Sequence, residues 1–104
     1  MIYEERTYTI KTGRVGEYLA IYEQLALPIQ REVLGHLVGF FSAEFGGLNK
    51  VVHIWGYQGL DDRAQRRAKL AAHPGWPAYL EKALPLIEAQ ENRVLIPTAF
   101  SPLK

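Results

Sequence analysis

The sequence predicts an α+β fold, in which one four-stranded antiparallel sheet carries helices on one of its two faces. Three observations lead to this class. Side chains alternate with a period of two over residues 2–10 and 50–57, as in strands, whereas apolar residues recur at spacings of three and four over 14–34, as in a helix. A glycine-rich turn at 46–49 is short enough to join two antiparallel strands. The 104 residues, 48% of them hydrophobic, are predicted to form a single domain over 1–104.

The first strand and the first helix are predicted over residues 2–34. Residues 2–10 combine alternation with Ile, Tyr and Thr, which strands favour. Thr12 is the expected N-cap of the helix over 14–34, because its hydroxyl can accept a hydrogen bond from the first turn. Pro28 lies inside this helix, and because proline has no N–H and its ring crowds the preceding turn, we expect a kink or a break there.

The second and third strands are predicted at residues 36–45 and 50–57. Residues 51–55 form the most hydrophobic run of the chain. Because the connection between the two strands is short, we expect them to pair as a hairpin.

The C-terminal part predicts two helices and one further strand. Asp61 is the expected cap of a helix over 62–72, and a second helix is predicted over 76–90. The last strand is predicted at 93–100. Since it contains Pro97, which cannot donate a ladder hydrogen bond, we place it at an edge of the sheet.

This order of elements, β-α-β-β-α(α)-β, is that of the ferredoxin-like split βαβ arrangement. Its helices cover only one face of the sheet, so the other face needs a cover, and a second copy of the chain is the simplest one. We therefore expect a homodimer. The small side chains of Val52 and Ile54 are predicted to face the helices, which leaves His53 and Trp55 on the open face.

Composition excludes several classes of protein. There is no cysteine, which excludes disulfides, thiolate nucleophiles and cysteine-ligated metal centres. The net charge of +1 argues against nucleic acid as a partner, and no apolar run is long enough for insertion into a membrane. The polar N-terminus is unlike a signal or transit peptide, so we expect a cytoplasmic protein. The three histidines lack metal-ligand spacing, and no motif indicates a cofactor.

Candidate functional residues come from two strands that this arrangement makes central neighbours. Glu4, Arg6 and Tyr8 alternate on the first strand and are predicted to lie beside His53 and Trp55 on the open face. Burying charges is costly unless they are paired. We therefore expect a polar cluster inside a covered cavity between the sheet and the partner subunit.

This cluster has two interpretations. It is either a polar network that sets the register of the dimer, or a site for a small organic ligand. In the second case Arg6 holds an anionic or carbonyl group, and His53 and Tyr8 act with it as catalytic groups that transfer a proton. The predicted ligand-binding residues are then Glu4, Arg6, Tyr8, Asn49, His53, Trp55 and Trp76.

The helix over 62–72 is basic, with Arg63, Arg66 and Arg67 on one face. Such a face is usually solvated. The alternative function is a non-enzymatic dimeric adaptor that docks a protein partner on these arginines.

The sequence resembles a known family in several stretches. YEERTYTIKTG at 3–13, LNKVVHIWGY at 48–57 and LDDRAQRR at 60–67 are similar to the NIPSNAP domain, as are Trp76, Tyr79 and PTAFSP at 97–102. The chain is identified on these residues as a member of that family, although Glu5 stands where the family usually has an aliphatic residue.

The resemblance implies a ferredoxin-like fold within the dimeric α+β barrel superfamily, in which two sheets face each other across a two-fold axis. Relatives in that superfamily include monooxygenases, whereas the NIPSNAP family has no established enzymatic activity. Monooxygenase- or isomerase-like chemistry is thus one use of the expected cavity. The family's eukaryotic members are mitochondrial and linked to vesicle traffic, but this compact unit resembles a bacterial member, and those roles are not carried over.

Overall fold

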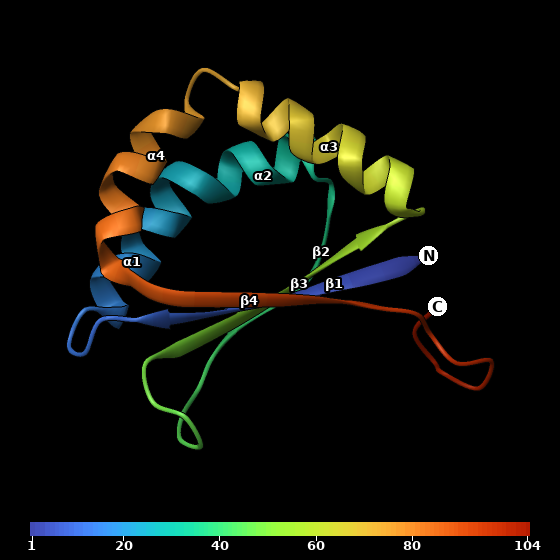
Figure 1. The fold of residues 1–104 in the computed structure, drawn as a ribbon, viewed down its shortest axis with the longest axis horizontal. Coiled ribbons are helices and arrows are strands. Elements are labelled where there is room, and N and C mark those ends of the chain that lie inside the picture. Colours follow the sequence, from blue (N-terminus) through green and yellow to red (C-terminus); the bar gives the residue numbers. More distant parts are fainter.

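The computed structural model describes residues 1–104 and contains one four-stranded antiparallel sheet in the order β2-β3-β1-β4. The strands are β1 (Ile2–Ile10), β2 (His36–Ser42), β3 (Lys50–Tyr57) and β4 (Ile87–Leu95), and the helices are α1 (Val15–Ile21), α2 (Leu27–Val33), α3 (Leu60–Ala72) and α4 (Trp76–Ala83). All four helices arch over one face of the sheet, and the other face carries no helix (Figure 1). This confirms the predicted α+β, ferredoxin-like class. No helix has the length and apolar character needed to cross a bilayer.

The first helical region adapts to Pro28 instead of breaking. A π-helical segment, Tyr22–Ala26, lies between α1 and α2, and the N–H of Leu27 bonds to the carbonyl of Tyr22. The wider π-helical turn shifts the backbone hydrogen-bond pattern just before Pro28. The helical region therefore continues, although Pro28 has no N–H to donate. The predicted cap is wrong, because Arg14 holds the N-cap position and the Thr12 hydroxyl instead accepts a hydrogen bond from Asn49.

Two strand and helix boundaries in the middle of the chain differ from the prediction. The β2 strand ends at Ser42, three residues before the predicted end, because the turn into β3 begins earlier. The α3 helix starts at Leu60 with Gly59 as its N-cap, so Asp61 is not the cap. Asp62 instead accepts a hydrogen bond from the backbone N–H of Gln58 at 2.9 Å.

The C-terminal helix and strand also differ. The α4 helix ends at Ala83, followed by a 3-10 turn at Leu84–Leu86, and β4 then begins six residues before the predicted strand. Glu, Ala and Gln at 88–91 favour a helix by propensity, but pairing of this segment along β1 overrides that preference. The edge position of the last strand is confirmed.

The prediction of which side chains face the helices is wrong. Val51, His53, Trp55 and Tyr57 are at most 1% exposed and belong to or adjoin the cores under the helices, whereas Phe41 on the opposite face is 56% exposed. Helices arch over this face (Figure 1), and large aromatic side chains, among them Tyr8, Tyr22 and Trp55, form the cores between them and the sheet. Glu5 accordingly faces the bare side, where it pairs with Arg93 at 3.3 Å.

Candidate functional site

Strand register brings the predicted polar residues into one cluster. In the antiparallel pairing of β1 with β3, Arg6 lies opposite His53 and Glu4 lies opposite Trp55. On its other side β1 pairs with β4, which places Asn92 opposite Arg6. The predicted neighbourhood of the two strands is therefore confirmed, but the cluster faces the helices rather than the open side of the sheet.

The Glu4 carboxylate is the centre of this cluster and is completely buried. Its Oε2 accepts hydrogen bonds from Arg6 Nη1 at 3.0 Å, Arg63 Nη2 at 2.7 Å and Asn92 Nδ2 at 2.6 Å. Burial by itself raises the pKa of Glu4, but the hydrogen bonds from Arg63 and Asn92 and the charges of both guanidinium groups outweigh burial and lower the pKa to about 2. Glu4 is thus a stable anion, and its Oε1 has no hydrogen-bond partner.

Arg6 connects Glu4 to Tyr8. Its Nε donates to the Tyr8 hydroxyl at 3.0 Å, and its guanidinium carbon lies 5.6 Å from the centre of the Tyr8 ring. Because Nε and Nη1 are the atoms that bond to the protein, Nη2 keeps its two N–H groups for another acceptor.

His53 lies in an aromatic environment and is 1% exposed. Its ring stacks on Phe40 at 4.8 Å and meets the Tyr8 ring edge-on at 5.1 Å. Its Nδ1 accepts a hydrogen bond from Trp55 Nε1 at 2.8 Å, and because an indole nitrogen only donates, the proton of the neutral imidazole belongs on Nε2. Burial, with a contribution from the charge of Arg6, lowers the pKa of His53 to about 3, so the ring is neutral near pH 7.

A cavity of about 170 Å³ lies between the sheet and the helices. Its lining residues come from both layers and are Arg6, Tyr8, Tyr22, Gln30, Arg67, Trp76, Tyr79, Leu80, Leu84, Ile87 and Gln90. Inside it the Tyr22 hydroxyl donates to Gln30 Oε1, and the Tyr79 hydroxyl lies 3.1 Å from that of Tyr18. The wall therefore combines aromatic and aliphatic surface with a few convergent polar groups, as small-molecule sites do.

The predicted site residues divide into three groups relative to this cavity. Arg6, Tyr8 and Trp76 line it. Glu4, His53 and Trp55 do not, but Glu4 bonds to Arg6, His53 packs against Tyr8, and Trp55 bonds to His53. Asn49 lies apart, in the turn before β3, with φ of 64° and its amide donating to Thr12 at 3.1 Å.

Arg67 and the helical tyrosines Tyr22 and Tyr79 line the cavity although they were not among the predicted site residues, and Arg67 was expected on a solvated or partner-docking face. Arg63 and Arg67 are four residues apart and so share a face of α3, which turns toward the sheet: Arg63 reaches Glu4 and Arg67 lines the cavity. Arg66 bonds to Asp62 at 2.8 Å. The hydroxyls of Tyr22 and Tyr79 on apolar stripes were the available signal, because a buried tyrosine needs a polar partner.

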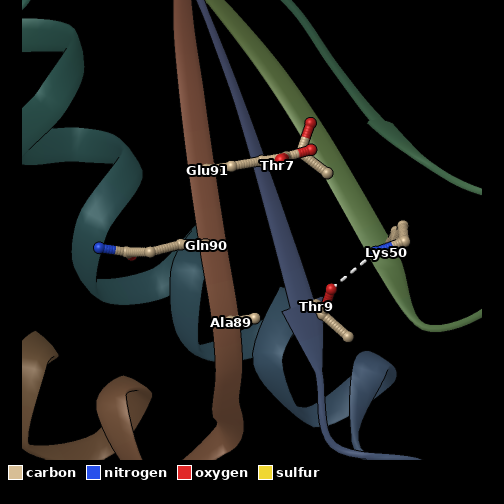
Figure 2. Close-up of a pocket in the computed structure, with 6 residues that line it drawn as sticks. All are labelled: Thr7, Thr9, Lys50, Ala89, Gln90 and Glu91. Carbon is tan, nitrogen blue, oxygen red and sulfur yellow. Dashed lines mark hydrogen bonds between the residues drawn. The ribbon is translucent and has the colours of Figure 1, made fainter.

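A second hollow, of about 150 Å³, lies on the bare face of the sheet. Figure 2 shows the side chains of Thr7, Thr9 and Glu91 on this side and that of Gln90 pointing the other way, toward the helices. Lys50 Nζ donates to Thr9 Oγ1 at 2.8 Å. The hollow results from short side chains in an uncovered sheet, and no cluster of His, Asp or Glu here or elsewhere is suited to a metal ion.

The chain is similar to known proteins over its whole length. A family model described as NIPSNAP matches residues 3–102. Protein NipSnap of Drosophila melanogaster is 37% identical over 101 residues, which are 97% of this chain and 36% of that protein, and NipSnap homolog 2 of Danio rerio is 35% identical over 103 residues, 99% of this chain and 35% of that protein. The chain spans about one fifth to two fifths of the length of the curated relatives it matches.

Solved structures match nearly the whole chain. A NIPSNAP family protein from Agrobacterium tumefaciens has a TM-score of 0.96 and 48% identity, covering 99% of this chain and 98% of that one. An uncharacterized NIPSNAP domain protein from Burkholderia xenovorans has a TM-score of 0.93 and 40% identity, covering 98% and 99%. A putative antibiotic biosynthesis monooxygenase from Nitrosomonas europaea, at 10% identity and a TM-score of 0.68 over 93% of this chain and 98% of that one, shares the fold.

Proposed function

The chain belongs to the NIPSNAP family, and on that premise we propose that it is a homodimer that binds a small organic molecule in the cavity between its own sheet and helices. The sequence-based expectation placed this cavity between the sheet and a partner subunit. We instead assign the ligand to the cavity on the helix side of the sheet, because the residues of the cluster lie there.

The observation that carries the proposal is the cavity itself. Its volume of about 170 Å³ is close to the roughly 150 Å³ of a protein cavity that accepts benzene. Arg6, Gln30 and Gln90 add polar groups to walls that are otherwise aromatic and aliphatic. Packed protein interiors contain few voids of this size. A cavity of this volume that also carries oriented polar groups therefore supports a ligand site.

The structure suggests distinct roles for the predicted catalytic residues. Arg6 and Tyr8 line the cavity, so we assign to them contact with a carbonyl or anionic group of the ligand. His53 does not line it and is neutral, which favours a positioning role through its edge contact with Tyr8. If the bound molecule reacts, in monooxygenase- or isomerase-like chemistry, Arg6 is the group that would polarise its carbonyl or anionic group.

The bare sheet face supports the homodimer. It presents Phe41, Val52, Ile54 and Leu95, and only 18 of 104 residues are buried within the single chain. The radius of gyration is 14.1 Å, compared with about 13 Å for a compact chain of 100 residues, as a sheet covered on one side only would give. A second copy applied to this face would bury these apolar side chains.

Native mass spectrometry of the freshly purified protein tests both parts. We expect a dimer that carries extra mass, lost on denaturation, from a small organic molecule. Leu80→Trp fills the cavity and should abolish the extra mass, whereas Leu60→Trp, on the 64% exposed Leu60 of α3, should keep it. A dimer without extra mass in both variants and in the parent protein would contradict the ligand, and a monomer would contradict the dimer.

A further inference from the structure

Positive charge around the cavity exceeds negative charge. Arg6 and Arg67 line it, and no acidic side chain does. The one nearby carboxylate, Glu4, is shared between Arg6 and Arg63. Three guanidinium groups, two of them lining the cavity, are thus matched by a single carboxylate, and one more negative charge inside the cavity would be electrostatically favourable.

Arg67 is the guanidinium without a carboxylate partner. Arg63 and Arg66, its neighbours on α3, each pair with a carboxylate, whereas Arg67 forms no ion pair and has only the neutral hydroxyl of Tyr57 beside it. Its charge nevertheless acts on the interior, where it contributes to lowering the pKa of His53 after burial and Arg6. A half-buried charge that has lost part of its hydration gains most from an anionic ligand.

Arg6 offers a second contact to the same ligand. Its Nε and Nη1 are held by Tyr8 and Glu4, which fixes the orientation of the guanidinium plane and leaves Nη2 free. A planar, oriented guanidinium with free N–H groups is suited to a carboxylate oxygen.

The remaining wall is suited to a flat apolar body. Tyr8, Tyr22, Trp76 and Tyr79 contribute rings, and the Trp76 and Tyr79 rings lie 4.8 Å apart. A volume of about 170 Å³ accommodates one six-membered ring with a small substituent but not a nucleotide or a lipid chain. An inorganic anion would leave the aromatic part of the cavity unfilled.

From these features we infer that the ligand is a small aromatic carboxylate, with its carboxylate between Arg6 and Arg67 and its ring against the tyrosine and tryptophan side chains. This inference rests on the proposed function and specifies its ligand class. Arg67 supplies the charge that Glu4 does not compensate, and Arg6 supplies the orientation.

Isothermal titration with three probes tests the inference. Benzoate carries both the ring and the charge, benzyl alcohol carries the ring alone, and acetate carries the charge alone. We expect benzoate to bind at least about tenfold more tightly than either of the others. Benzyl alcohol lacks the charge-assisted hydrogen bond and acetate lacks the buried ring, and each of these is worth about this factor or more.

Two variants of α3 assign the effect to Arg67. Arg67→Gln should weaken benzoate binding by about tenfold or more and leave benzyl alcohol unchanged. Lys69→Gln is the matched control, because it removes one positive charge from an exposed position on the same helix and should leave both affinities unchanged.

The outcomes separate this inference from the proposed function. Equal binding of benzoate and benzyl alcohol would overturn the anionic ligand and leave the small-molecule cavity standing. Equal benzoate affinity in Arg67→Gln and Lys69→Gln would overturn the role of Arg67. If none of the probes binds, the aromatic carboxylate is wrong, and the retained mass in native mass spectrometry then decides separately whether any small molecule is bound.

Discussion

Glu4 of β1 and Arg63 of α3 join the sheet to the helical layer through one ion pair, in which Arg63 Nη2 lies 2.7 Å from Glu4 Oε2. The carboxylate is completely buried and the arginine side chain is 26% exposed. Since the same oxygen also holds Arg6, this pair links the helix that carries Arg67 to the strand that carries Arg6. Glu4 thus holds the two walls of the cavity together and also neutralises part of the positive charge of the arginines around it.

Replacing Glu4 tests this link. Glu4→Gln leaves Arg6 and Arg63 without their shared anion, and removal of one partner from a buried ion pair costs about 3 kcal/mol. The matched control is Glu5→Gln on the opposite face, which loses only a more exposed pair with Arg93 and should cost less than about 1 kcal/mol. Denaturant unfolding of both variants measures the difference, and equal losses of stability would contradict the structural importance of the Glu4 pair.

The pH dependence of stability should reflect the same carboxylate. The folded-state pKa of Glu4, about 2, is below the ordinary value of 4.5, so its contribution to stability is present above pH 4.5 and is lost as the pH falls toward 2. The shift corresponds to about 3 kcal/mol. Urea unfolding at intervals from pH 6 to pH 2 should show a steeper loss in the parent protein than in Glu4→Gln, and parallel curves would argue against a depressed pKa.

His53 should contribute in a higher pH range. Its folded-state pKa of about 3 is below the ordinary 6.5, so the unfolded chain binds a proton that the folded chain excludes, and stability falls as the pH decreases from 6.5 toward 3. His53→Gln should flatten the stability curve between pH 6.5 and about pH 5.5, which is above the range in which Glu4 titrates. His36→Gln, in which the replaced side chain is exposed, serves as the control and should keep the slope.

Tryptophan fluorescence should report ligand binding from one residue only. The chain has two tryptophans, of which Trp76 lines the cavity and Trp55 is completely buried beside His53. Addition of benzoate should therefore change the emission of Trp76. Trp76→Phe should remove the change and Trp55→Phe should keep it, whereas the reverse pattern would place the ligand elsewhere.

The bare face of the sheet should control assembly. Val52 lies on a central strand, opposite Thr7 on one side and Phe41 on the other. Val52→Lys should convert the dimer to a monomer, because burying an added charge between two packed sheets is costly. Leu60→Lys, on the exposed side of α3, should leave the dimer intact. Analytical ultracentrifugation distinguishes these states, and a dimer that persists in Val52→Lys would place the interface elsewhere.

The parts of the fold that could be predicted are those in which local pattern and tertiary structure agree. The bounds of β1 and β3 were predicted correctly, because both strands are central and one of their faces is buried. The β4 strand could not be predicted from local pattern, since all eight of its residues after Ile87 are exposed and its helix-favouring residues are overridden by pairing with β1. The two ends of this strand are specified by its partner rather than by its own sequence.

The sequence predicted that Glu4, Arg6 and Tyr8 lie beside His53 and Trp55, but not which face of the sheet these side chains occupy. Alternation shows that Glu4, Arg6 and Tyr8 share a face, yet a period of two is the same from either side of the sheet. The choice of face depended on which side chains pack under the helices, and this packing exists only in the assembled fold. Arg67 was missed for the same reason, because its role follows from how α3 lies over the sheet.

The most direct test of a ligand site between the sheet and the helices is a crystal structure with 4-bromobenzoate, located by the anomalous scattering of bromine. We expect bromine density inside the cavity near Tyr22 and Tyr79, with the carboxylate within hydrogen-bond distance of Arg6 and Arg67. Bromine density only on the bare face of the sheet, or a cavity that stays empty at saturating ligand, would contradict this expectation.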